Sequence, residues 1–131
     1  MLTQQLKRNE HTPSILIVDD DENILELIAE GFKVFGMKVF KAQNGEEAWS
    51  IFTEKHIDAV LSDIWMPGID GIELSSRIHQ RSPQTKIALM TGGDTTAAKQ
   101  LLENGIVHQF FEKPFSLSFV CKSIVMKIES A

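Results

Sequence analysis

Five polar side chains that could take part in chemistry each stand at the end of a short segment rich in apolar residues. Asp19 and Asp20 follow the run ILIV, and Asp63 comes just after the run AVL. Thr91 follows IALM, and Lys113 follows the partly apolar segment HQFFE. Runs of this kind are typical of strands buried on both faces of a parallel sheet. In open α/β sheets, binding sites lie outside the carboxyl ends of such strands.

The types of these residues indicate a site for phosphoryl transfer. Three carboxylates in one pocket repel one another, so they call for a cation, and all-oxygen ligands favour a hard divalent ion such as Mg²⁺. Asp63 could attack a phosphorus atom in line. The metal and Lys113 would neutralise charge on the transferring group, and Thr91 would hydrogen-bond one of its oxygens. We therefore predict a magnesium-dependent site built on Asp63.

The elements that must position these residues alternate regularly between strand and helix. Short apolar or β-branched segments predict strands over residues 15–18, 37–42, 59–61, 87–90 and 108–112. The segments between them carry apolar residues at helical spacing, including Leu27 in the first helix and Leu102 in the fourth. Such alternation predicts an α/β fold, with a parallel sheet and helices on both faces. Right-handed crossovers then bring the carboxyl ends of the strands to one edge.

Composition indicates a single domain. The chain has 131 residues, of which 43% are hydrophobic and 24% are charged, which suffices for one core. A formal net charge of −5 and scattered lysines and arginines argue against direct nucleic acid binding. One cysteine and the absence of an apolar run of about 18 residues predict no internal disulfide, no membrane span and a cytoplasmic location. Residues 1–13 are expected to form a polar leader before one domain over residues 14–131.

Four motifs stand in order at the strand ends, namely VDDDEN, LSDIWMPGIDG, LMTGG and EKPF. Their order, spacing and placement resemble those of the receiver domain of two-component response regulators, including the chemotaxis regulator. The resemblance runs from about residue 14 to residue 128. It implies a flavodoxin-like (βα)5 three-layer sandwich, in which the five-stranded parallel sheet has the strand order 2-1-3-4-5.

The resemblance also implies how phosphate and metal would be held. Asp63 matches the phosphoacceptor of the family, and Asp19 and Asp20 match its acidic pair. Asp20 and Asp63 would bind Mg²⁺ directly, and Asp19 would bind it through water. The backbone carbonyl of Trp65 would be a further ligand.

A conformational switch is the next implication of the resemblance. Thr91 matches the switch hydroxyl, and Lys113 matches the lysine of the family pattern. Phe110 matches the aromatic switch position, although Phe111 competes with it for the buried place, because neighbours in a strand face opposite sides. The expected readout surface combines the elements over residues 97–102, 108–112 and 117–128.

The implied function is acceptance of a phosphoryl group from a sensor histidine kinase or a phosphotransfer protein, rather than turnover of a substrate. The signal would pass to a downstream effector protein or to an output domain outside this chain. One alternative is a Mg²⁺-dependent phosphohydrolase with an Asp nucleophile, but the dehalogenase-type pattern has a second Asp where Trp65 stands. A dinucleotide-binding enzyme would need a glycine-rich turn where the three acids 19–21 stand. Whether the receiver is free-standing or cut from a longer regulator stays open.

Two positions bear on how long a phosphorylated Asp63 would last. In the family, the residues two past the acceptor and two past the switch hydroxyl flank the path of attacking water, and here they are Trp65 and Gly93. Neither carries a carboxylate, amide or hydroxyl to orient the water, so we predict slow hydrolysis. The indole of Trp65 could also obstruct the path, whereas Asp94 could reach in from the loop.

The other reactive side chains are interpreted as structural. Asp21 is expected to be a helix-entry acid, stabilised by the helix dipole. Cys121 lies beside the core face of the last helix, where a packed and inert thiol is expected. The histidines show no metal-ligand spacing; they are His11, His56, His79 and His108.

Overall fold

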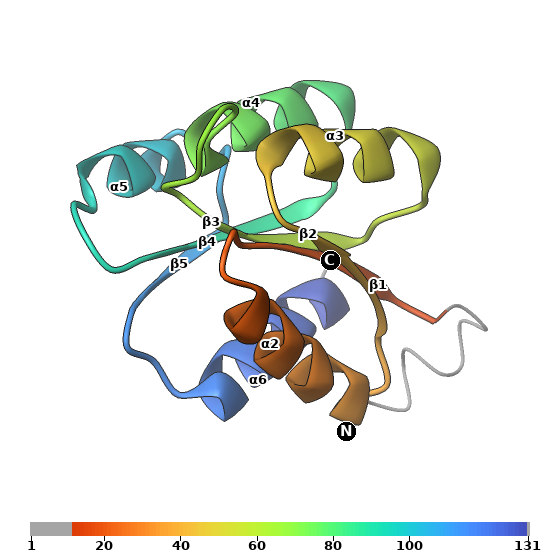
Figure 1. Cartoon of the computed structure of the whole chain (residues 1–131). Coiled ribbons are helices and arrows are strands. Elements are labelled where there is room, and N and C mark those ends of the chain that lie inside the picture. Colours follow the sequence, from red (N-terminus) through yellow and green to blue (C-terminus); the bar gives the residue numbers. More distant parts are fainter. Residues whose placement is uncertain (1–11, 131) are drawn as a thin grey trace.

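The computed structural model describes residues 12–130, which form five strands and five helices (Figure 1). The strands are β1 (Ser14–Val18), β2 (Lys38–Ala42), β3 (Ala59–Asp63), β4 (Lys86–Thr91) and β5 (Gln109–Glu112). The helices are α2 (Glu22–Val34), α3 (Gly45–Glu54), α4 (Gly71–Arg81), α5 (Thr96–Glu103) and α6 (Leu117–Glu129). Of the leader predicted over residues 1–13, residues 1–11 lie outside the described part of the chain.

All five strands are parallel and lie in the order β2-β1-β3-β4-β5. This order confirms the flavodoxin-like α/β sandwich implied by the resemblance. Helices α3, α4 and α5 cover one face of the sheet, and α2 and α6 cover the other (Figure 1). Because every crossover returns to the same edge, the residues that follow β1, β3, β4 and β5 are brought to one side of the molecule.

The two central strands, β1 and β3, are buried along their whole length. Their alternate residues belong to different cores. Ile15 and Ile17 pack with residues of α2 and α6, whereas Leu16 and Val18 pack with residues of α3, α4 and α5. Burial on both faces explains why these strands are continuous apolar runs rather than alternating patterns.

Two apolar residues that were counted in the helical spacing are exposed. Leu27 is 62% exposed and Leu102 is 38% exposed, so the placing of Leu27 on the apolar face of its helix is wrong. Successive residues of a helix are turned by about 100° from one another. Leu27 therefore points away from the face of α2 that buries Leu25 and Ile28. Of the neighbours Leu101 and Leu102, only Leu101 is buried in α5.

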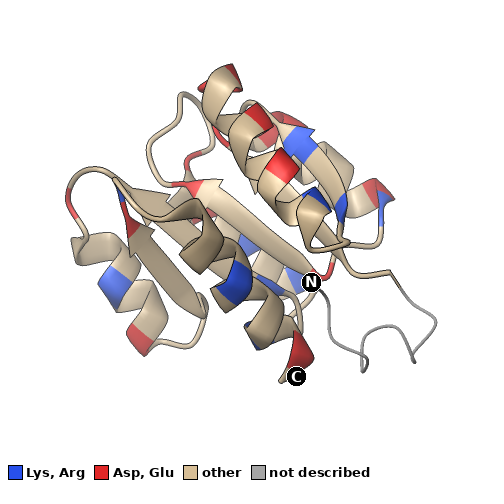
Figure 2. Cartoon of the chain, turned by 90° about the horizontal axis from the view of Figure 1, so that it is seen from below, with Lys and Arg blue, Asp and Glu red and all other residues tan. Residues whose placement is uncertain are grey.

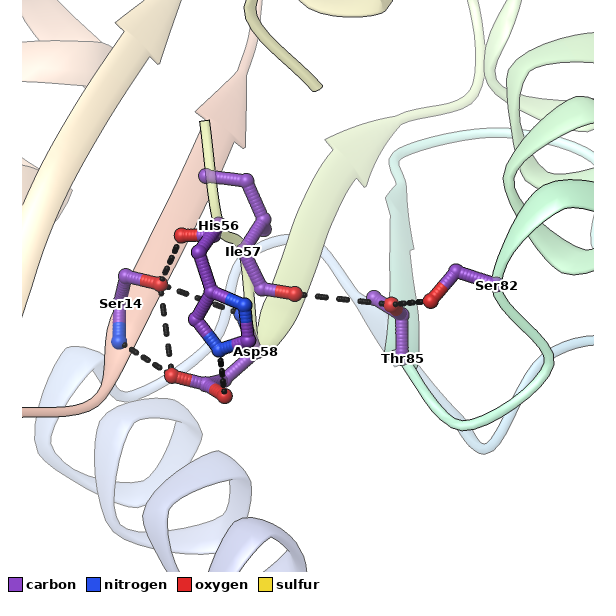
Figure 3. Close-up of polar contacts among 6 residues, drawn as sticks. All are labelled: Ser14, His56, Ile57, Asp58, Ser82 and Thr85. Carbon is purple, nitrogen blue, oxygen red and sulfur yellow. Dashed lines mark hydrogen bonds and ion pairs between the residues drawn. The ribbon is translucent and has the colours of Figure 1, made fainter. Parts of the chain in front are cut away.

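Polar groups bind one another at the amino edge of the sheet (Figure 3). The Ser14 backbone N–H donates to the Asp58 carboxylate at 2.9 Å, and the Ser14 hydroxyl donates to the His56 carbonyl at 2.6 Å. His56 Nε2 lies 3.0 Å from the other Asp58 oxygen. The hydroxyls of Ser82 and Thr85 are 2.8 Å apart. These contacts fasten the chain just before β3 and β4 and at the first residue of β1.

Charged residues of both signs occur on the side of the molecule formed by α2 and α6 (Figure 2). Both helices carry acidic as well as basic residues, so this side of the molecule is not a purely basic surface. Within residues 12–130, no helix is both long enough and apolar enough to cross a bilayer.

Candidate functional site

Asp19, Asp20 and Asp63 come together at the carboxyl edge of the sheet. Asp19 and Asp20 follow β1, and Asp63 is the last residue of the neighbouring β3. The parallel register sets Val18 opposite Ser62, so the next residues of the two strands lie side by side. Each of the three acids offers a carboxylate oxygen, and these oxygens lie within 4.8 Å of one another. The grouping of the three acids is therefore confirmed.

Lys113 brings a positive charge to these acids from the far side of β4. It follows β5, and its Nζ lies 3.2 Å from Asp19 Oδ2 and 3.7 Å from Asp63 Oδ2. Its backbone N–H donates to the Thr91 carbonyl at 2.8 Å, which fixes the start of the side chain. A long lysine stem can thus span one strand of the sheet and still place its ammonium group between two carboxylates.

Thr91 is the last residue of β4 and is buried, with 1% exposed. Its Oγ1 accepts a hydrogen bond from the Gly93 N–H at 3.0 Å. A hydroxyl can accept and donate at once, so the O–H of Thr91 is left to donate to an incoming oxygen. The end of β4 therefore carries a hydroxyl that can donate a hydrogen bond, and the role of Thr91 at the site stays a prediction.

The electrostatics of the cluster are unbalanced. Burial raises the pKa of Asp63; the Lys113 ammonium opposes that rise, and the charges of Asp19 and Asp20 add to it. Three carboxylates against one ammonium leave an excess of two negative charges. Carboxylate oxygens are the ligands that Mg²⁺ prefers, and a divalent cation would cancel the excess. The donor set of this site therefore fits a magnesium ion.

Comparison with known proteins identifies the family. The sequence matches the family model of the response regulator receiver domain over residues 15–125. The chain belongs to this family. The match favours a receiver domain over the phosphohydrolase alternative.

The chain resembles parts of longer proteins. This chain is 34% identical over 110 residues to the Autoinducer 1 sensor kinase/phosphatase LuxN of Vibrio harveyi, and the match covers 84% of this chain and 13% of that protein. It is 30% identical over 116 residues to the C4-dicarboxylate transport transcriptional regulatory protein DctD of Pseudomonas aeruginosa, covering 88% of this chain and 25% of DctD. The chain therefore spans a quarter or less of the length of these two relatives.

A solved structure supports the fold of the receiver domain independently. The CheY-like response regulator receiver domain protein of Methanospirillum hungatei superposes with a TM-score of 0.86. The two are 25% identical, and the match covers 92% of this chain and 96% of that one.

Trp65 stands at the mouth of the receiver's site. Its side chain is exposed, and a Cβ placed on Gly93 would lie 3.7 Å from the indole Nε1. The indole thus lies beside the loop that follows β4. Asp94 is engaged elsewhere, because one of its carboxylate oxygens accepts from the N–H and the hydroxyl of Thr96, at 2.9 and 2.7 Å. These bonds lower the pKa of Asp94 and hold its carboxylate over the start of α5.

The two phenylalanines of β5 face opposite sides of the sheet. Phe111 is 9% exposed and packs in the core beneath α2 and α6. Phe110 is half-buried and packs against the core on the α5 side. Phe111 is thus the more deeply buried of the pair, as the alternation of side chains in a strand requires.

Two of the side chains interpreted as structural, Asp21 and Cys121, lie where expected. Asp21 caps α2 by accepting from the N–H groups of Asn23 and Ile24. Cys121 is buried, and burial raises the pKa of its thiol to about 11, which keeps it protonated. The acids that could hold a metal ion within residues 12–130 are Asp19, Asp20 and Asp63, and His11 lies outside those residues.

One contact at the site has no counterpart in the sequence pattern. The Glu46 carboxylate, on the first turn of α3, accepts a hydrogen bond from the Ile69 N–H at 3.3 Å. Ile69 lies in the loop that follows Asp63. The one signal in the sequence is the pair Gly45 and Gly68, because glycine often marks a close approach of two backbones.

Proposed function

We propose that this receiver domain accepts a phosphoryl group on Asp63 from a sensor histidine kinase or a phosphotransfer protein. The observation that carries the proposal is the position of the Lys113 ammonium, which lies against carboxylates from two different strand ends. A cation held there can neutralise charge on an incoming phosphoryl group.

The contacts of the three acids support Asp63 as the acceptor. Both oxygens of Asp19 are occupied, one by the Asp21 N–H at 2.9 Å and the other by Lys113 at 3.2 Å. Asp63 is farther from Lys113, at 3.7 Å, and its raised pKa makes its carboxylate more basic than an ordinary aspartate. A more basic carboxylate is a better nucleophile toward phosphorus.

The reaction would form one bond and break one. A carboxylate oxygen of Asp63 attacks the phosphorus of a phosphohistidine, the P–N bond breaks, and the imidazole leaves with its electron pair and takes up a proton. Lys113 and the Thr91 hydroxyl then bind oxygens of the acyl phosphate. Asp20 and Asp63 would hold Mg²⁺ directly, Asp19 would hold it through water, and the Trp65 carbonyl would be a further ligand. The ion would supply further neutralisation of phosphoryl charge.

The consequence of phosphorylation would be a change on one face of the molecule. Thr91 and Lys113 are joined by a backbone hydrogen bond at the ends of β4 and β5, so a movement at the phosphate reaches both strands. Phe110 lies on β5 toward α5 and would move with them. We propose that α5, β5 and α6 form the readout surface for an effector protein or an output domain.

The proposal covers the rest of the chain as well. Residues 14–131 would form the receiver domain and residues 1–13 a polar leader, and the protein would act in the cytoplasm as a signalling domain rather than a turnover enzyme. The phosphorylated state would be long-lived. Trp65 and Gly93 offer no carboxylate, amide or hydroxyl to orient water, and the Asp94 carboxylate is hydrogen-bonded to Thr96.

Replacement of Asp63 by Asn tests the acceptor. The wild-type chain should gain one phosphoryl group per molecule from a small acyl phosphate or phosphoramidate donor with Mg²⁺, as measured by intact-mass spectrometry. The Asp63→Asn chain should gain none, because an amide is not a nucleophile here. Asp94→Asn is the matched control and should be labelled like the wild type. Stoichiometric label on Asp63→Asn would overturn the assignment.

A further inference from the structure

The loop between Asp63 and α4, here called the acceptor loop (residues 64–70), is closed at its base. The Gly71 N–H donates to the Ile64 carbonyl at 2.8 Å. A Cβ on Gly71 would lie 2.4 Å from the Asp63 carbonyl oxygen, so the two ends of the loop are in direct backbone contact. Any larger residue at 71 would push these ends apart.

The far end of the acceptor loop is held by the first turn of α3. A Cβ on Gly45 would lie 2.2 Å from the Ile69 carbonyl oxygen, so α3 touches the loop backbone at this point. The Glu46 Oε2 accepts from the Ile69 N–H at 3.3 Å. A Cβ on Gly68 would meet both Glu46 oxygens, at 2.5 and 2.9 Å, and Gly68 has a φ of 76°. The Glu46 carboxylate therefore fills the space beside the turn at Gly68 and Ile69.

Trp65 lies between these two fastened ends. Its carbonyl oxygen can keep one position only if both the base and the turn of the loop stay in place. The base is held by contacts between backbone atoms. The turn depends on the side chain of Glu46, which lies 23 residues before Ile69 in the sequence. Groups that orient a metal ligand without touching the metal change metal affinity when they are removed.

We propose that Glu46 is a positioning residue for the acceptor loop, which sets the place of the Trp65 carbonyl and, through the loop base, of Asp63. This inference rests on the proposed function. Glu46 acts as a hydrogen-bond acceptor toward Ile69, so a neutral amide of the same length can replace it.

Glu47 provides a matched control in the same helical turn. Its Oε1 accepts from the Gln43 N–H at 2.7 Å, and its own N–H donates to the Asn44 side chain. Glu47 thus caps the helix without contacting the acceptor loop. If Glu46 served only as an acid favoured by the dipole of α3, removal of either glutamate would have the same effect.

The experiment compares Glu46→Ala, Glu46→Gln and Glu47→Ala in a Trp49→Phe background, in which Trp65 is the one tryptophan left to report Mg²⁺ binding. The first readout is amide hydrogen exchange at Ile69 in metal-free protein. The second is the Mg²⁺ dissociation constant from Trp65 fluorescence. We expect Glu46→Ala to speed Ile69 exchange and to weaken Mg²⁺ binding by roughly tenfold, with Glu46→Gln close to the wild type and Glu47→Ala unchanged in both.

Three results would overturn the inference. They are unchanged Mg²⁺ affinity in Glu46→Ala, an equal loss in Glu47→Ala, and failure of Glu46→Gln to rescue. Failure of the proposed function would look different, because the background protein itself would then bind no Mg²⁺ or Asp63→Asn would still be labelled. The exchange rate at Ile69 tests the hydrogen bond between Glu46 and the acceptor loop in the absence of metal and phosphate.

Discussion

An aspartate stands at each end of β3, and the two differ in the charges and hydrogen-bond donors around them. Asp58 stands just before the strand, and Asp63 is its last residue. The Asp58 carboxylate is bound by the Ser14 backbone N–H at 2.9 Å and by His56 at 3.0 Å (Figure 3). At Asp63 the cation Lys113 is 3.7 Å away and two further carboxylates lie close by. The charge of Asp58 is met by hydrogen bonds from the fold, whereas the charge of Asp63 lies among further negative charges.

The difference shows why chemistry belongs at one edge of a parallel sheet. Helices α2, α4 and α6 begin at the carboxyl edge, where Asp21, Asp70 and Ser116 cap them. Helix amino termini favour anions such as phosphate, whereas the opposite edge receives the carboxyl ends of helices. At the amino edge, polar side chains fasten strands; at the carboxyl edge, they leave charge unbalanced.

The largest expected effect is a difference between two lysines, Lys113 at the carboxyl edge of the sheet and Lys55 at the amino edge. Lys113→Ala should reduce the rate of phosphorylation by a small-molecule donor by roughly 100-fold or more, because it removes a preorganised donor to the phosphoryl oxygens. Lys55→Ala, at the carboxyl end of α3, should leave the rate unchanged. Initial rates of label incorporation would measure both. Equal rates in the two variants would erase the contrast between the edges.

Metal binding should also belong to one edge. Asp20→Ala should weaken Mg²⁺ binding by about 10-fold to 100-fold, because it removes one of the clustered carboxylates, which is proposed to bind the ion directly. Asp58→Asn should bind Mg²⁺ as the wild type does. A Mg²⁺ titration monitored by tryptophan fluorescence provides the measurement. If Asp20→Ala bound the ion as tightly as the wild type, the metal site would lie elsewhere.

Stability should change in opposite directions at the two ends of β3. Asp58→Asn should lower the free energy of unfolding by about 1–3 kcal/mol, since it weakens bonds to partly buried partners. Asp63→Asn should raise it in metal-free buffer at neutral pH, since it removes a charge that is held in a buried place and lies beside two other carboxylates. Urea unfolding in the presence of a chelator would show the signs.

The pH dependence follows from the raised pKa of Asp63. The folded protein holds the Asp63 proton more tightly than the unfolded chain, so ionisation of Asp63 lowers stability as pH rises through its pKa. The gain from Asp63→Asn should therefore be full at neutral pH and should vanish as pH falls below the ordinary carboxyl pKa. A gain that grew on acidification would contradict the raised pKa of Asp63.

The smallest expected effect lies within the carboxyl edge. Gly93→Glu and Trp65→Asn should each speed loss of the phosphoryl group by roughly tenfold, because each supplies a group that can orient water. Asp94→Asn should not, since that side chain is bound to Thr96. Phosphate release over time would distinguish them. Unchanged release in both substituted chains would mean that water is already oriented without these groups.

The sequence alone carried the alternation of strands and helices and the residues at the strand ends. Both are local properties of the chain. Burial on two faces requires an apolar run in β1 and β3, and the polar residue of the site stands where each run ends. The spacing of apolar residues gave a wrong prediction where it could not tell which way a side chain points from its helix. Leu27 fits an apolar count along α2, yet it is 62% exposed, because the helix turns it away from Leu25 and Ile28.

Tertiary structure decided how distant strand ends meet. The order β2-β1-β3-β4-β5 was implied by family resemblance and not by any pattern within the chain. That order sets β1 beside β3, and so Asp19 beside Asp63, and lets Lys113 reach both across β4. The bond from Ile69 to Glu46 depends on the close contact of Gly45 with the loop. Such contacts arise from the packing of whole elements, which no short stretch of sequence encodes.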